Sequence, residues 1–380
     1  MKSAYIVSAV RTPIGRRRGM FSQVLPLTLS TLAVKEAVAR AGVDPADVDD
    51  VILGCVTPIG EQGANIARLT ALHARFPVTV PGVTINRMCG SSQQAVHFAA
   101  QAIMAGDMDI VVAGGVEHMT RVPMASDYPQ TWPEDFPYDL VPQGISAELI
   151  AEKWGLSRMM LDQFGYESHQ RAGRATREGL FEPEIVPVEV PADGGTRLAT
   201  VDEGIRFDTS LEKMLALKPA FKEDGVVTAG NSSQISDGAA ALVIMSESAI
   251  NRYGLEPMAR IVARTVVGDD PILMLTGVIP ATRDVLARAG LRLDDIDIFE
   301  VNEAFASVVL AWMAEFQPDP AKVNPRGGAI ALGHPLGASG ARIMTTLVHE
   351  LMQTRRRYGL QVMCIGHGMA TATIIENLTL

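Results

Sequence analysis

The 380-residue chain contains few cysteines, which excludes some classes of protein, and few aromatic residues, which suits a core built on aliphatic side chains. Its three cysteines, Cys55, Cys89 and Cys364, form no C-x-x-C pair, so the sequence indicates neither a disulfide framework nor a zinc site. A P-loop, a strand-following G-x-G-x-x-G and an H-E-x-x-H motif are also missing. These absences disfavour nucleotide-binding folds and metalloenzymes, and we expect no metal.

Long hydrophobic runs and excess positive charge are missing as well. No run of about 18 apolar residues occurs, so we expect no membrane span. The N-terminal segment lacks the apolar core of a signal peptide, and the final "ENLTL" carries no peroxisomal address. The formal net charge of −10 disfavours nucleic-acid partners. Reduced cysteines in such a chain predict a cytoplasmic location.

The sequence alternates predicted strands with predicted helices, and part of this pattern occurs twice along the chain. The chain is 47% hydrophobic with 34 glycines, which suits a covered parallel sheet. The stretch "ARAGVDPADVDDVILG" (39–54) aligns without a gap with "ARAGLRLDDIDIFEVN" (287–302). The sequence therefore predicts two similar α/β halves. We place the first half at 1–117 plus 243–260, a loop domain without counterpart at 118–242, and the second half at 261–380.

The motif "RMCGSS" (87–92) places Cys89 between a predicted strand and a predicted helix. A helix N-terminus stabilises a thiolate, so this position predicts a lowered pKa for Cys89. Ser91 with Gln94 forms a candidate capping box, and Gly90 allows a substrate close to the backbone. The alternative is a buried structural cysteine.

Three further motifs put reactive groups in loops or at strand ends. "NPRGGAIALGHPLGASGAR" (324–342) holds His334 in a loop before a helix that Ser339 is expected to cap. His334 is a candidate general base. Asn302 in "EVNEAFA" and Cys364 in "MCIGHGMA" end buried strands, and ligands bind at the carboxyl ends of parallel strands. The small-residue loop "TAGNSSQISDGAA" (228–240) suits a long, thin ligand.

Together these motifs, with "AGGVEHM", resemble the thiolase family of the acetyl-CoA acyltransferase type along nearly the whole chain. The resemblance implies an α/β fold of two similar βαβαβαββ halves, stacked as a five-layer α/β/α/β/α sandwich with an inserted loop domain. It also implies thiolytic cleavage of 3-ketoacyl-CoA with CoA, giving acetyl-CoA and a shortened acyl-CoA through an acyl-cysteine. Coenzyme A would be a substrate, with no tightly bound cofactor.

The resemblance gives each motif residue a role. Cys89 would be the nucleophile, His334 would take its proton, and Cys364 would act as acid and base at the α-carbon of acetyl-CoA. The backbone N–H groups of Cys89 and Gly366 would form one oxyanion hole, and His334 with a water held by Asn302 the other.

The resemblance also implies where CoA and other chains bind. The CoA contacts would be Arg206 near the adenine, Ser233 near the pantetheine arm, and Phe221 and Phe305 along the tunnel. A homodimer or homotetramer is expected, with a β-oxidation partner subunit as an option.

Two departures from the family pattern bear on substrate choice. His367 replaces the middle glycine of the usual "CIGGG", and is a candidate for lining the acyl site if its backbone tolerates histidine. Pro142 and Gln143 replace the histidine and methionine of acetoacetyl-specific biosynthetic members, which favours a degradative enzyme for longer or bulkier substrates. The alternatives are a biosynthetic acetoacetyl-CoA thiolase, a non-catalytic acyl-CoA-binding protein and, ranked last, a decarboxylating condensing enzyme.

Overall fold

The structure is a computed structural model that describes residues 2–380, and its main element is a ten-stranded sheet. The strands of this sheet are β1 (Ala4–Arg11), β2 (Gly15–Arg16), β3 (Asp50–Gly54), β4 (Gly82–Ile85), β5 (Ile110–His118), β8 (Ser236–Ser246), β9 (Ala259–Gly268), β10 (Ile298–Val301), β11 (Tyr358–Ile365) and β12 (Met369–Asn377). The strand order is β10-β11-β12-β9-β1-β8-β5-β3-β4, with β2 paired to β8. The two halves join edge to edge, because β1 pairs with β9 through Tyr5 and Ile6.

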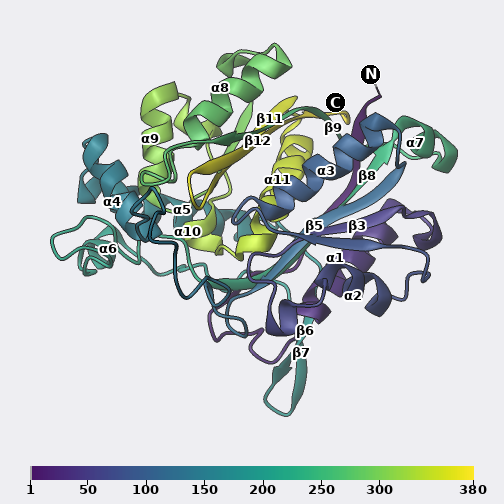
Figure 1. Ribbon diagram of the computed structural model, residues 1–380, viewed down its shortest axis with the longest axis horizontal. Helices are drawn as coiled ribbons and strands as arrows, with labels where there is room; N and C mark the ends of the chain where they lie inside the picture. Colours follow the sequence, from purple (N-terminus) through teal and green to yellow (C-terminus); the bar gives the residue numbers. More distant parts are fainter. Residues whose placement is uncertain (1) are drawn as a thin grey trace.

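Helices form the other layers (Figure 1). They are α1 (Pro26–Ala41), α2 (Ile66–His73), α3 (Ser91–Ala105), α7 (Glu247–Tyr253), α8 (Val278–Ala289), α9 (Ala306–Phe316), α10 (Ala329–Leu332) and α11 (Leu336–Thr354). Helices α1 and α2 cover the outside of the first half, and α8 covers the outside of the second. Helices α3 and α11 lie between the halves, and α11 contacts strands of both. The predicted α/β fold is confirmed, with helices outside each half and between the halves; the strands of the two halves form one continuous sheet.

The sequence repeat is also a repeat in three dimensions. Helix α1 ends at Gly42 with φ 68°, and α8 ends at Gly290 with φ 66°. Both glycines take the left-handed conformation that favours a residue without Cβ. A short 3-10 turn follows each helix and leads into β3 or β10. The order β3-β5-β8-β1 in the first half therefore matches β10-β11-β12-β9 in the second.

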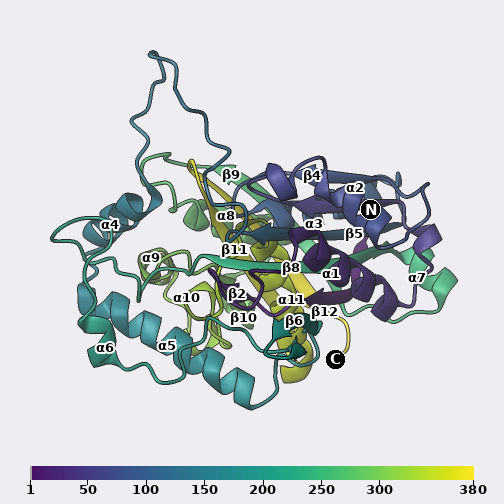
Figure 2. The ribbon, with the colours of Figure 1, turned by 90° about the horizontal axis from the view of Figure 1, so that it is seen from below.

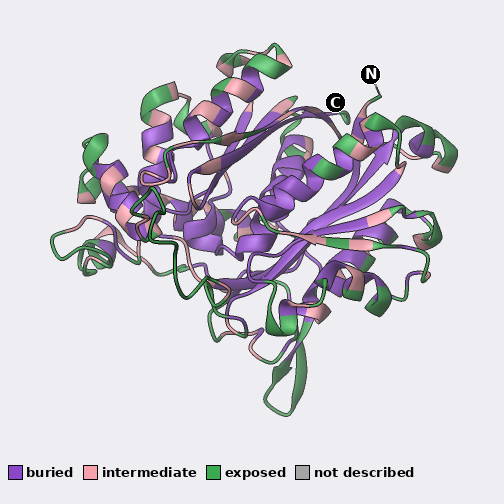
Figure 3. Ribbon diagram, in the orientation of Figure 1, coloured by how far each residue is buried: buried purple, intermediate pink, exposed green. Residues whose placement is uncertain are grey.

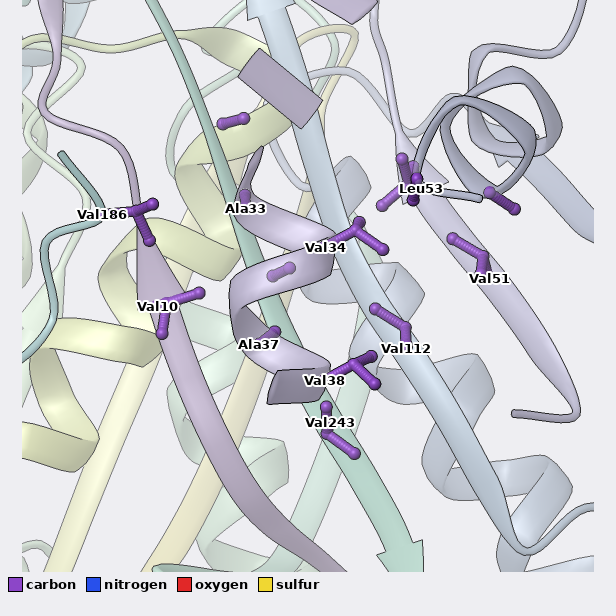
Figure 4. Close-up of a cluster of buried hydrophobic side chains, with 14 of the residues drawn as sticks. Val10, Ala33, Val34, Ala37, Val38, Val51, Leu53, Val112, Val186 and Val243 are labelled. Atoms are coloured by element: carbon purple, nitrogen blue, oxygen red, sulfur yellow. The ribbon is translucent and has the colours of Figure 1, made fainter. Parts of the chain in front are cut away.

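Aliphatic packing holds α1 on the first half. The helix turns Val34 and Val38 towards the sheet, where they meet Val112 of β5 and Val243 of β8 (Figure 4). All four side chains are buried, and burying a side chain of this size contributes about 1.5–3 kcal/mol. The valine-rich strands are buried on both faces, as expected of a sheet covered by helices on each side.

The two central helices approach each other closely at their N-terminal ends. A Cβ added at Gly340 of α11 would lie 2.4 Å from the backbone nitrogen of Gln93 in α3. The N–H of Ala341 donates to Ser92 Oγ at 2.8 Å. Both helices are buried along most of their length (Figure 3). The segments that precede α3 and α11 are thereby brought to the same region.

The chain between β5 and β8 has no counterpart in the second half. It contains α4 (Gln143–Lys153), α5 (Arg158–Arg177), α6 (Leu211–Leu215) and the hairpin of β6 (Val188–Ala192) and β7 (Gly195–Ala199). The segment 119–142 projects away from the body (Figure 2). The predicted boundary at residue 242 falls inside β8, which pairs with β1 and β5 in the main sheet. The division into domains otherwise stays a prediction.

Within residues 2–380, none of the helices combines the length and the apolar character that crossing a membrane requires.

Gly337 gives a test of the close approach between α11 and the first half. A Cβ there would lie 2.7 Å from Val116 O and 2.8 Å from Cys55 Cα, which are backbone atoms of the first half. We expect Gly337→Ala to lower the free energy of unfolding by about 1–3 kcal/mol in urea denaturation, because overpacked backbone cannot move aside. The matched control is Gly195→Ala, where no other described atom lies within 4 Å. Equal effects of the two substitutions would contradict this packing.

Candidate active site

Cys89 lies in a strained turn between β4 and α3. Met88 has φ 45°, a left-handed value that a non-glycine residue seldom adopts. Ser91 Oγ accepts the Arg87 N–H at 2.9 Å and donates to Met88 O at 2.6 Å, so it closes the turn around Cys89. The predicted capping box is wrong, because Gly90 is the N-cap and Ser91 is already helical. The serine holds the nucleophile's turn instead of capping the helix.

Burial raises the pKa of Cys89 to about 11. Three donors oppose this rise: the Gly366 N–H, the N–H of Cys89 itself and the Gln143 side chain. The prediction of a lowered pKa is therefore wrong, since desolvation of the thiolate outweighs the donors around it. At neutral pH, Cys89 is an uncharged thiol, 3% exposed, with hydrogen-bond donors ready for a negative charge.

His334 lies in the loop between α10 and α11, and Ser339 fixes its tautomer. Ser339 Oγ lies 2.5 Å from His334 Nδ1 and donates its own hydrogen to Pro335 O at 2.9 Å. The imidazole must therefore donate from Nδ1, which leaves the lone pair on Nε2. The N-cap of α11 is Pro335, so the expected capping by Ser339 is not found.

Electrostatics keep His334 neutral. Burial, followed by the positive charge of Arg342, lowers its pKa to about 3. Arg342 is itself fully buried on α11. The imidazole is therefore unprotonated at neutral pH, and its Nε2 lone pair can accept a proton when a thiolate forms.

Asn302 connects His334 to the second thiol. Its N–H continues the pairing of β10 with β11 by donating to Val362 O at 3.0 Å. Asn302 Nδ2 lies 3.5 Å from His334 Nε2 and 3.9 Å from Cys364 Sγ. Asn302 Oδ1 is buried and has no protein donor within residues 2–380, so it can accept from a water or a substrate.

Cys364 also lies close to Cys89. Burial, followed by the negative charge that Cys89 can carry, raises the pKa of Cys364 to about 12. Cys89 packs in one apolar cluster with Leu336, two residues after His334, and with Ile365, next to Cys364. The structure thus brings together Cys89, His334, Cys364, Asn302 and Gly366, all of which the sequence singled out.

The candidate CoA residues occupy the inserted segment and its border. Arg206 lines a cavity of about 270 Å³ together with His169 and Lys213. Its N–H donates to His169 Nδ1 at 3.1 Å, which fixes the loop that carries it. Phe221 and Phe305 meet edge to face, with ring centroids 5.9 Å apart.

Ser233 connects this region to the candidate catalytic residues. Its N–H donates to Ala304 O at 2.9 Å, two residues after Asn302. Ser233, Phe221 and Phe305 are not among the lining residues of the Arg206 cavity. Phe305 follows Asn302 by three residues, so Ser233, Phe305 and the Phe221 ring that packs on it lie beside the strand end that carries Asn302.

No group of three or more His, Cys, Asp or Glu side chains between residues 2 and 380 is arranged to hold a metal ion. The expectation that no metal or tightly bound cofactor takes part stays a prediction.

Family models match both halves of the chain. The thiolase N-terminal domain matches residues 4–248, and the thiolase C-terminal domain matches residues 255–377. The chain belongs to the thiolase family.

Among its relatives is the steroid 3-ketoacyl-CoA thiolase FadA6 of Mycobacterium tuberculosis, 50% identical over 100% of this chain and 95% of that protein. The 3-ketoacyl-CoA thiolase of Pectobacterium carotovorum is 47% identical over 100% of both chains.

Two crystal structures of thiolases match the fold equally well. The acetyl-CoA acetyltransferase of Bacillus anthracis has a TM-score of 0.93 and 40% identity, over 100% of this chain and 99% of that one. Human mitochondrial 3-ketoacyl-CoA thiolase has a TM-score of 0.93 and 38% identity, over 99% of both chains. Because these two proteins differ in their named activity and share one fold, the fold alone does not distinguish between the two activities.

Sequence reasoning missed three contributors to this thiolase site. Gln143 was noted only as a departure from the family, yet its side chain reaches the Cys89 sulfur. Ser339 was expected to cap a helix, and Arg342 was not singled out. A serine five residues after the histidine and an arginine inside an apolar helix were the available signals, but neither reveals which atom it faces.

Ser339→Ala tests the fixed tautomer. Without the hydroxyl acceptor, Nδ1 loses its partner and the proton can move to Nε2, so we expect turnover to fall about 10–100-fold. Ser339→Thr, which keeps the hydroxyl, should recover most of the activity. The measurement is the pH profile of kcat/KM with a 3-ketoacyl-CoA, beside urea unfolding. Loss of stability with an unchanged profile would mean that Ser339 is only structural.

Proposed function

We propose that this chain cleaves 3-ketoacyl-CoA by thiolysis in a degradative pathway, with Cys89, His334 and Cys364 as its catalytic residues. The observation that carries the proposal is that Asn302 joins the neutral imidazole of His334 to the uncharged thiol of Cys364, while the uncharged thiol of Cys89 lies close enough to raise the pKa of Cys364. The names of its relatives, 3-ketoacyl-CoA thiolase and steroid 3-ketoacyl-CoA thiolase, support the degradative direction.

In the first half-reaction, His334 Nε2 takes the thiol proton as Cys89 Sγ attacks the ketone carbon. The N–H groups of Gly366 and Cys89, which already point at this sulfur, stabilise the oxyanion. The bond between the α- and β-carbons breaks and its electron pair passes to the acetyl-CoA enolate. Cys364 gives its proton to that carbon, while His334, now protonated, and a water on Asn302 stabilise the enolate oxygen. Acetyl-CoA leaves, and the acyl group stays on Cys89.

In the second half-reaction, free CoA releases the acyl group. The Cys364 thiolate takes the proton of the CoA thiol, whose sulfur attacks the acyl-Cys89 carbonyl. Cys89 leaves as a thiolate and recovers its proton from His334. Both cysteines end as thiols, so one cycle leaves the protein unchanged.

The charge of CoA has to be met locally, since the whole chain carries a formal charge of −10. Arg206 supplies positive charge at the 270 Å³ cavity, which suits the nucleotide end of CoA, while Asp208 in the same cavity pairs with Lys213 at 3.4 Å. The pantetheine arm of CoA would then extend towards Cys364, bordered by Phe221, Phe305 and Ser233. We further propose a cytoplasmic homodimer or homotetramer, with a β-oxidation partner subunit as an option.

Acetoacetyl-CoA synthesis is the second candidate, because both directions use the same residues and the same transition state. Pro142 and Gln143, which begin α4 beside Cys89, favour the degradative direction. A carrier without catalysis needs neither a fixed tautomer on His334 nor a second thiol, so the site favours an enzyme.

Cys364→Ala separates the role of Cys364 as acid and base from the role of Cys89 as nucleophile. We expect 3-ketoacyl-CoA cleavage to fall at least ~100-fold, because the leaving carbanion has no acid. Transfer of a saturated acyl group from acyl-CoA to Cys89 should persist, since CoA leaves as a thiolate. The measurement is the mass of the intact protein after brief exposure to acyl-CoA. Retained cleavage in Cys364→Ala, or an adduct on Cys89→Ala, would contradict the assignment.

Arg206→Ala tests the CoA site. Removing a guanidinium that binds ground state and transition state alike should raise the KM for CoA about tenfold and leave kcat nearly unchanged. Steady-state kinetics with varied CoA measure this. Arg197→Ala, at an exposed position on β7, is the matched control. Equal KM values in both variants would place the CoA nucleotide elsewhere.

A further inference from the structure

His367 occupies a backbone position that is unfavourable for it. The turn that joins β11 to β12 has φ 64° at His367 and φ 76° at Gly368. Two successive positive φ values are those of a type I′ turn, for which asparagine, aspartate or glycine are the usual first residues. A histidine here costs folding free energy that a glycine would not, and strained residues of this kind concentrate at functional sites.

The strained turn carries an aromatic ring to the surroundings of Cys89. His367 directly follows Gly366, whose N–H reaches the Cys89 sulfur. The imidazole ring lies 6.0 Å from the ring of Tyr128, centroid to centroid, with 45° between the ring planes. Tyr128 comes from the projecting segment 119–142 (Figure 2), so two distant parts of the chain meet here.

Tyr128 is close to the nucleophile and yet accessible. Burial, followed by the negative charge that Cys89 can carry, raises the pKa of the Tyr128 phenol, so the ring lies within electrostatic range of the sulfur. The side chain is nevertheless 42% exposed. An aromatic surface that is close to the reacting sulfur and open to solvent can contact an acyl group on Cys89.

Gln143 also reaches the Cys89 sulfur with its side chain. Its Nε2 lies 3.3 Å from the place where Gly366 would carry a Cβ, so the start of α4 packs against the β11–β12 turn. The start of α4, the β11–β12 turn and the projecting segment thus surround Cys89 together.

We propose that His367 and Tyr128 form an aromatic wall for the acyl group, and that this wall selects 3-ketoacyl-CoA substrates bearing a saturated ring beside the ketone. This specificity rests on the proposed thiolytic function. Two flat rings inclined to one another offer two apolar faces. A saturated ring presents a broad face of C–H groups and has few rotatable bonds to immobilise, whereas an unbranched chain loses more freedom against the same surface.

The experiment compares 3-cyclohexyl-3-oxopropanoyl-CoA with 3-oxononanoyl-CoA, two substrates with equal numbers of acyl carbons. We expect the wild-type chain to have a kcat/KM about tenfold higher for the cyclic substrate. His367→Asn keeps a residue that tolerates positive φ and removes the ring, and it should bring the ratio close to one. Tyr128→Leu should do the same, whereas Tyr128→Phe should keep the preference.

Two control variants test whether the substrate preference comes from the aromatic wall or from another feature of the chain. Phe136→Leu removes an aromatic ring that packs on Trp132 and Tyr138 of the same segment, and it should keep the wild-type ratio. His367→Gly should lose the preference and unfold at a higher urea concentration, because the backbone strain is relieved.

The possible outcomes are distinct. A wild-type preference for the linear substrate, or an unchanged ratio in His367→Asn, would overturn the aromatic wall alone. If the wild-type chain cleaves none of the three substrates, the cyclic one, the linear one or acetoacetyl-CoA, the proposed function is overturned together with the aromatic wall.

Discussion

The close contact between α3 and α11 at their N-terminal ends is the constraint on which the site depends. Gly340 leaves no room for a side chain against Gln93, and the Ala341 N–H donates to Ser92 Oγ. Each half of the molecule supplies one of these helices, and each helix is preceded by a segment that carries a reactive residue. Cys89 and His334 are far apart along the chain, but the internal repeat places them at equivalent ends of paired helices. Cys364 joins them because β11 ends in the same region.

Burial, more than any single charge, governs the chemistry of this site. It raises the pKa of both cysteines and lowers the pKa of His334, so the resting site holds neutral groups. A buried ion pair would carry a large desolvation cost. Here charge develops only during attack, at the sulfur where the N–H groups of Gly366 and Cys89 are already aimed. The polar groups that fix the geometry, Ser339 and Asn302, are themselves buried, so the donors need little rearrangement when the charge appears.

The sequence predicted those parts of this arrangement that depend on short, local stretches of the chain. The repeat around 39–54 and 287–302 predicted two halves, and the glycine-rich motifs predicted Cys89, His334 and Cys364. It failed where the outcome depends on the whole chain. The helix N-terminus suggested a lowered pKa for Cys89, but the sign is set by burial from both halves, which no local pattern records. Likewise, Ser339 has the spacing of a helix cap, and only the packed loop turns its hydroxyl to His334. The predicted boundary at residue 242 falls inside β8, because the small residues in 228–240 resemble a loop although 236–240 already belong to that strand.

The pH dependence of Cys89 alkylation tests most directly whether the resting site is neutral. Iodoacetamide reacts with thiolate, so its rate follows the ionised fraction, and mass spectrometry of the labelled peptide separates Cys89 from Cys55 and Cys364. With a pKa of about 11, the rate at Cys89 should rise close to tenfold for each pH unit between pH 6 and 9, without reaching a plateau. A rate that is already constant near pH 7 would show a preformed thiolate–imidazolium pair and contradict the account.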